Sequence, residues 1–168
     1  MSDLDSTKVS QEIQALLDSY FSNINTWTSA ANHYIQFIQS PEETAIPLDR
    51  ELALLGVQSK TLTENISSSV TQIRKKFLEV FDSLTKQDFH NWANDQECFD
   101  IITELYHVHK AFQSVFTTFK DIVSEYFYHI IQPKSFENII YTTFLLQQTT
   151  ETLETLLAEF KLFKSGQL

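Results

Sequence analysis

Hydrophobic residues recur along this chain at steps of three and four, the spacing that places side chains on one face of an α-helix. The longest such stripe runs from Leu48 to Leu84 and predicts a helix on the order of 50 Å long. A stripe of about ten turns is typical of a coiled coil or of a helix in a bundle. Its members are Leu48, Leu52, Leu55, Leu62, Ile66, Val70, Ile73, Phe77, Val80 and Leu84, with Ser59 in the one polar slot.

Three further stripes predict helices at about 7–39, 95–131 and 136–164, and residues 1–6 are expected to form a flexible tail. Ser135 is expected to cap the last helix, after the break at Gln132-Pro133-Lys134. Four long helices with short connections predict an all-α, up-down-up-down four-helix bundle, folded as a single domain over residues 1–168. The chain has only two glycines and three prolines, and sheets would need more turns than these residues supply.

The stripes of the first two helices each contain one irregularity, where two steps of four follow one another. These irregularities centre on Tyr20 and Ile66, which lie equally far from the predicted connection between the helices. An extra four residues unwinds a supercoil locally, and this is tolerated best where both partners unwind together. The first two helices are therefore expected to pack antiparallel with Tyr20 and Ile66 level. Gly56, inside the second helix, is expected to mark a bend or a close helix approach.

Charge and cysteine content narrow the class of protein. The net charge is −10 and only two arginines are present, so nucleic acid and anionic membrane surfaces are not expected partners. A single cysteine, Cys98, excludes an internal disulfide and fits a reducing compartment. The N-terminal residues show no signal-peptide pattern and no apolar run approaches about 18 residues. We therefore expect a cytoplasmic protein without a transmembrane segment.

Catalytic and metal-binding signatures are sparse. Di-metal bundles need two Glu-x-x-His motifs, and this chain has one, Glu104 to His107, on the polar stripe of its helix. His109 points about 200° away from His107, so the two cannot share a metal, and we expect a semi-buried histidine with satisfied hydrogen bonds. Cys98 occupies an apolar stripe and is expected to be a small buried core residue. We predict no enzymatic activity and no cofactor.

Aromatic residues are concentrated where the third helix gives way to the fourth. In an up-down bundle this corner lies at the same end as the connection between the first two helices. We call this end the aromatic pole and expect it to bind a partner, because exposed apolar patches mark interaction sites. The alternative is a thick, well-packed end of the core under a folded-back 39–47 loop. The candidate partner-binding residues are Tyr34, Phe37, Ile46, Tyr126, Phe127, Tyr128, Phe136, Ile140, Tyr141, Phe144 and Leu145.

Three functions follow from these patterns. The first is a non-enzymatic protein–protein interaction module, an adaptor, inhibitor or complex subunit, that binds another protein or a second copy of itself. The second follows from Ser40-Pro41-Glu42-Glu43 between two long helices, where the chain is similar to phasins of polyester granules. That resemblance implies an amphipathic protein that coats a hydrophobic granule. The third, a metal-dependent helical-bundle enzyme, rests only on the Glu104–His107 motif.

Overall fold

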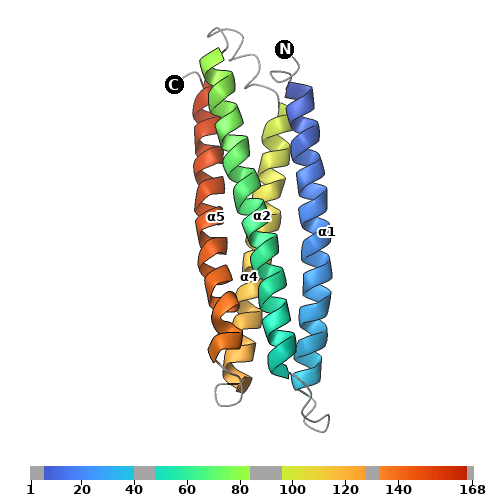
Figure 1. The fold of residues 1–168 in the computed structure, drawn as a ribbon. Helices are drawn as coiled ribbons and strands as arrows, with labels where there is room; N and C mark the ends of the chain where they lie inside the picture. The colour runs from blue at the N-terminus through green and yellow to red at the C-terminus, as the bar shows by residue number, and fades with distance from the viewer. Residues whose placement is uncertain (1–5, 40–47, 84–95, 128–132, 166–168) are drawn as a thin grey trace.

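The computed structural model describes residues 6–39, 48–83, 96–127 and 133–165, and these residues form four long helices (Figure 1). The helices are α1 (Ser6–Ile38), α2 (Leu48–Ser83), α4 (Gln96–Phe127) and α5 (Pro133–Ser165). They run in alternating directions and pack side by side, which confirms the predicted all-α four-helix bundle. No helix in the described part of the chain has a stretch apolar enough, over sufficient length, to cross a membrane.

The predicted helix bounds agree with the structure at most ends. Ser6 already belongs to α1, while residues 1–5 of the expected tail lie outside the described residues. The predicted end of the third helix, residues 128–131, also lies outside them. The expected start of the last helix after Ser135 is wrong, because α5 begins at Pro133. Proline lacks only an N–H that the first turn does not use, and its fixed φ suits that turn.

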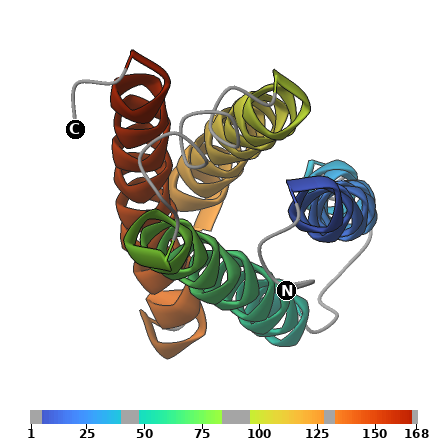
Figure 2. The same cartoon turned by 90° about the horizontal axis from the view of Figure 1, so that it is seen from above.

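The order of the helices around the bundle is α1, α2, α5, α4, so that α2 and α4 lie across the diagonal from each other (Figure 2). The neighbours α2 and α5 therefore run parallel, as do α1 and α4 (Figure 1). The closest packing joins α2 to α5. The bundle is thus two parallel pairs, joined along the α1–α2 and α4–α5 seams.

Gly56 accounts for the close packing of α2 against α5. A Cβ atom built on Gly56 would lie 3.1 Å from Cβ of Asn138 and 3.6 Å from Cδ1 of Ile139. Small buried side chains on both helices, Ser59 and Thr142 among them, leave further room for the backbones to approach. The glycine therefore marks a close helix approach, one of the two expected roles, and its partner is α5.

Trp27 anchors α1 to both of its neighbours. Its ring centroid lies 5.5, 5.3 and 5.2 Å from those of Phe112, Phe116 and Phe119 on α4. Its Nε1–H donates a 3.0 Å hydrogen bond to the backbone oxygen of Leu55 on α2. A buried aromatic group of this size contributes both apolar burial and ring-edge attraction.

Two cross-links set the register of α1 against α2. Trp27 bonds to Leu55 near one end of the shared interface, and Lys76 pairs with Glu12 at 2.6 Å near the other. Tyr20 and Ile66 are both buried between these two links. This register agrees with the predicted antiparallel packing in which the two irregularities lie level.

Candidate functional site

The structure separates the predicted aromatic-pole residues into a buried set and an exposed set. Tyr34 is 1% exposed and packs near Phe119, so it belongs to the core and cannot offer the surface that we expected. Phe136 is partly buried against the core, and Phe37 and Leu145 are also half-buried. Ile46 and Tyr128 lie outside the described residues, and the side chains of Tyr126 and Phe127 are outside them as well.

The exposed set lies on one face of α5. Ile140 and Tyr141 are each 46% exposed and Phe144 is 67% exposed, the largest value among the exposed large hydrophobic residues of the described chain. The spacing of three and four residues makes these side chains neighbours on the helix surface. We call Ile140, Tyr141 and Phe144 the α5 patch.

The inner and outer faces of α5 do not follow the usual division of polar and apolar residues. Its inner face buries Thr142, Thr149 and Thr150 beside the apolar core residues. The hydroxyl groups of Thr149 and Thr150 bond to backbone oxygens one turn earlier on α5. A bundle helix selected only for folding would place its large apolar groups inward and its threonines outward. The arrangement on α5 therefore leaves the outward aromatic residues without a role in the core.

The neighbouring helix α2 borders the α5 patch. Nζ of Lys60 lies 5.2 Å from the ring centroid of Tyr141, within reach of a cation–π interaction, and 3.8 Å from Glu64. One turn before Lys60, Val57 is also exposed. The patch is thus bordered by a cation held against an aromatic face.

A second apolar surface lies between α1 and α4. An open groove of about 570 Å³ is lined by Phe21 and Ile24 from α1 and by Val108, Phe112 and Val115 from α4. The sequence pattern assigned Val108 and Val115 to the apolar stripe of the third helix and did not identify the groove. The signal that was missed is Phe21, an aromatic residue beside the stripe of α1 rather than on it.

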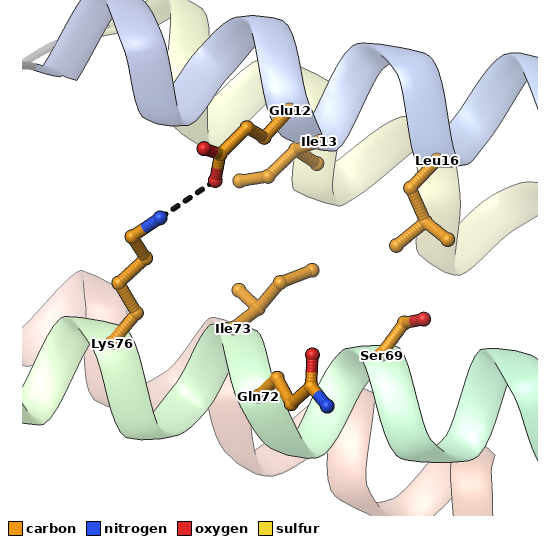
Figure 3. Close-up of a pocket in the computed structure, with 7 residues that line it drawn as sticks. All are labelled: Glu12, Ile13, Leu16, Ser69, Gln72, Ile73 and Lys76. Carbon is orange, nitrogen blue, oxygen red and sulfur yellow. Dashed lines mark hydrogen bonds and ion pairs between the residues drawn. The ribbon is translucent and has the colours of Figure 1, made fainter. Parts of the chain in front are cut away.

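A smaller pocket of about 260 Å³ opens between α1 and α2 (Figure 3). Ile13, Leu16 and Ile73 form its apolar part. The ion pair between Glu12 and Lys76 crosses it from one helix to the other (Figure 3). At about 570 Å³ the α1–α4 groove is the larger of these two sites.

His109 forms a buried polar link between three helices. Its Nε2 lies 3.0 Å from the backbone oxygen of Leu146 on α5, and its Nδ1 lies 2.7 Å from the hydroxyl of Tyr20 on α1. The carbonyl oxygen can only accept, so the neutral ring carries its proton on Nε2 and Tyr20 donates to Nδ1. Burial lowers the pKa of His109 below its ordinary value of 6.5 and raises the pKa of Tyr20 well above 10. Both groups are therefore neutral at pH 7 and their hydrogen bonds are satisfied.

The remaining candidates for chemistry fall in two places, Cys98 in the core and the Glu104–His107 motif on the surface of α4. Cys98 is fully buried, with its Sγ 2.9 Å from Oγ of Ser10, while Glu104 and His107 are exposed on α4. Within the described ranges, no group of three or more His, Cys, Asp or Glu side chains is placed to hold a metal ion. These positions supply neither a nucleophile–base pair nor a ligand set.

Comparison of the chain with protein-family models, with curated protein sequences and with solved structures found no match. The candidate sites therefore rest on the geometry of this molecule alone.

Proposed function

We propose that this bundle is a non-enzymatic protein–protein interaction module of the cytoplasm that binds its partner through the α5 patch. The observation that carries the proposal is the exposure of Phe144, with Ile140 and Tyr141 beside it, on a helix that buries threonines. Interface centres are enriched in aromatic residues that fill a pocket of the partner.

The size of the α5 patch favours an anchor within a modest interface. The exposed parts of its three side chains amount to about 300 Å², which is the scale of a functional patch on a monomer. A stable protein–protein interface of ordinary size buries about 800 Å² on each partner, well beyond this patch. We therefore propose a reversible complex with another protein, bound by a few aromatic contacts.

The test compares capture of binding proteins by the wild type and by Phe144→Ser. Leu162→Ser is the matched control, because Leu162 is also exposed and lies near the other end of α5. The proposal predicts that a specific protein is retained by the wild type and by Leu162→Ser but lost by Phe144→Ser. A monomer in light scattering that retains nothing, or a partner that Phe144→Ser retains unchanged, contradicts it.

A second candidate is a protein that coats an apolar surface, as the similarity to phasins implies. The observation that favours it is that exposed large hydrophobic residues occur on all four helices, including Phe21 on α1, Leu54 on α2 and Val115 on α4. Adsorption to polystyrene particles would then draw on many residues, so Phe144→Ser would weaken it only slightly. Failure of the wild type to bind such particles excludes this candidate.

A further inference from the structure

The groove between α1 and α4 has the form of a site for an additional helix. Its floor contains the buried Ile24 and Phe112, and its rims carry Phe21, 52% exposed, and Val115, 42% exposed. Along α4 the lining residues extend from Asp100 to Val115, about 22 Å at 1.5 Å per residue. An amphipathic helix of about 15 residues would match that length and place its apolar face on this floor.

The charged residues that line the groove are acidic. Asp100 and Glu104 line the end nearest the start of α4, and His107 lies one turn further on. No lysine or arginine is among the described residues that line the groove. The whole chain carries a net charge of −10, so its long-range field attracts cations.

From this floor and these charges we propose that the α1–α4 groove binds a basic amphipathic helix of a partner protein. Leucine-like side chains at helical spacing cover Ile24 and Phe112, and lysine or arginine side chains at one end meet Asp100 and Glu104. Apolar contacts provide the affinity and the acidic end sets the direction of the bound helix.

A second copy of this chain does not fit the same groove. The chain has one basic cluster, Arg74-Lys75-Lys76 on α2. Arg74 pairs with Glu159 at 2.7 Å and Lys76 pairs with Glu12 at 2.6 Å. Both ion pairs would have to break before this cluster could meet the acidic end of the groove, so the complementary helix is taken to come from another chain.

The test measures binding of a fluorescein-labelled helical peptide of about 15 residues, with leucines on one face and lysines on the other, by fluorescence anisotropy. A peptide with glutamate in place of lysine is the matched probe. The proposal predicts micromolar binding of the lysine peptide, weakened at least tenfold in 0.5 M salt, and at least tenfold weaker binding of the glutamate peptide.

Variants of the protein locate the peptide. Val115→Arg and Glu104→Lys are each expected to weaken binding at least tenfold. The controls Val57→Arg and Glu51→Lys make the same charge changes at exposed positions of α2 and are expected to leave the affinity within twofold. If Val115→Arg lowers the melting temperature, the binding measurement is repeated with Val115→Ser, which removes apolar area without adding charge.

Equal weakening by Val115→Arg and Val57→Arg would overturn the proposal, since it would mean that the peptide adheres to the acidic surface in general. Absence of binding at 1 mM peptide, or self-association of the wild type that Val115→Arg abolishes, would overturn it too. The groove and the α5 patch lie on different helices, so Phe144→Ser should leave peptide binding unchanged. Failure of one proposal is thereby distinguished from failure of the other.

Discussion

Removing the hydroxyl of Tyr20 tests the buried link between α1, α4 and α5. The change Tyr20→Phe keeps the ring but leaves Nδ1 of His109 without its 2.7 Å partner in the core. An unsatisfied buried acceptor costs about 1–3 kcal/mol, so the expected loss is about 2 kcal/mol, or about 4–8 °C in Tm for a chain of this length. Urea unfolding followed by circular dichroism at pH 7 measures it.

The double variant Tyr20→Phe/His109→Leu distinguishes the loss of the hydrogen bond between Tyr20 and His109 from the loss of packing contacts at each position. Leu146 lies inside α5, so its backbone oxygen still accepts the helical N–H hydrogen bond when His109 is removed. With both polar partners removed, no orphaned group remains between positions 20 and 109. The double variant is therefore expected to lose about 1–3 kcal/mol less than the sum of the two single losses.

The same link predicts the pH dependence of stability. Burial lowers the folded-state pKa of His109 below 6.5, so the unfolded chain binds the proton first as pH falls. The contribution of neutral His109 to the free energy of unfolding is fully present above pH 6.5. It falls by at most about 1.4 kcal/mol per pH unit as the pH decreases from 6.5 to the folded-state pKa. His109→Leu should remove this decrease between pH 6.5 and 5.5, because the two proteins differ only at position 109. Equal pH profiles for the two proteins, or strict additivity in the double variant, would refute the assigned hydrogen bonds.

Five further variants test the packing and the surface. Gly56→Leu should lower the free energy of unfolding by more than about 3 kcal/mol in chemical denaturation, because even a Cβ atom lies 3.1 Å from α5. Gly56→Ala should lower it less, because alanine favours the helix more than glycine does and this offsets part of the close contact. Trp27→Ala should cost about 3–5 kcal/mol and shift the thermal transition accordingly. Glu159→Gln should cost no more than about 1 kcal/mol in urea unfolding, since its partner Arg74 is near the surface. Phe144→Ser should change the free energy of unfolding by less than about 0.5 kcal/mol, and a larger loss would show that Phe144 serves the fold.

The sequence pattern predicted the four helices, their alternating directions and the placement of Tyr20 and Ile66 at the same height along α1 and α2. Periodicity and the lengths of the segments determine these features. It did not predict that α2 packs beside α5 rather than α4. A stripe shows which face is buried but not which helix covers it. Gly56 likewise indicated a bend or a close helix approach, without identifying the helix that it contacts.

The candidate site was only partly predictable. Aromatic density located Ile140, Tyr141 and Phe144, but it could not separate them from Tyr34, which continues the core stripe of α1. Because α5 buries Thr142 and Thr149, its core-facing side differs from the side that its large apolar residues alone would predict. The α1–α4 groove depends on the side-by-side packing of two helices distant in sequence, and no local pattern contains that information.

Photo-crosslinking in cells that contain the native chain tests whether the α5 patch binds a partner protein. A benzophenone amino acid in place of Phe144 keeps an aromatic group on the exposed face, and the same group at Leu162 is the control. Binding through the α5 patch predicts one discrete adduct with another protein from position 144 and none of that mass from position 162. Absence of an adduct at position 144, or the same adducts from both positions, would contradict it.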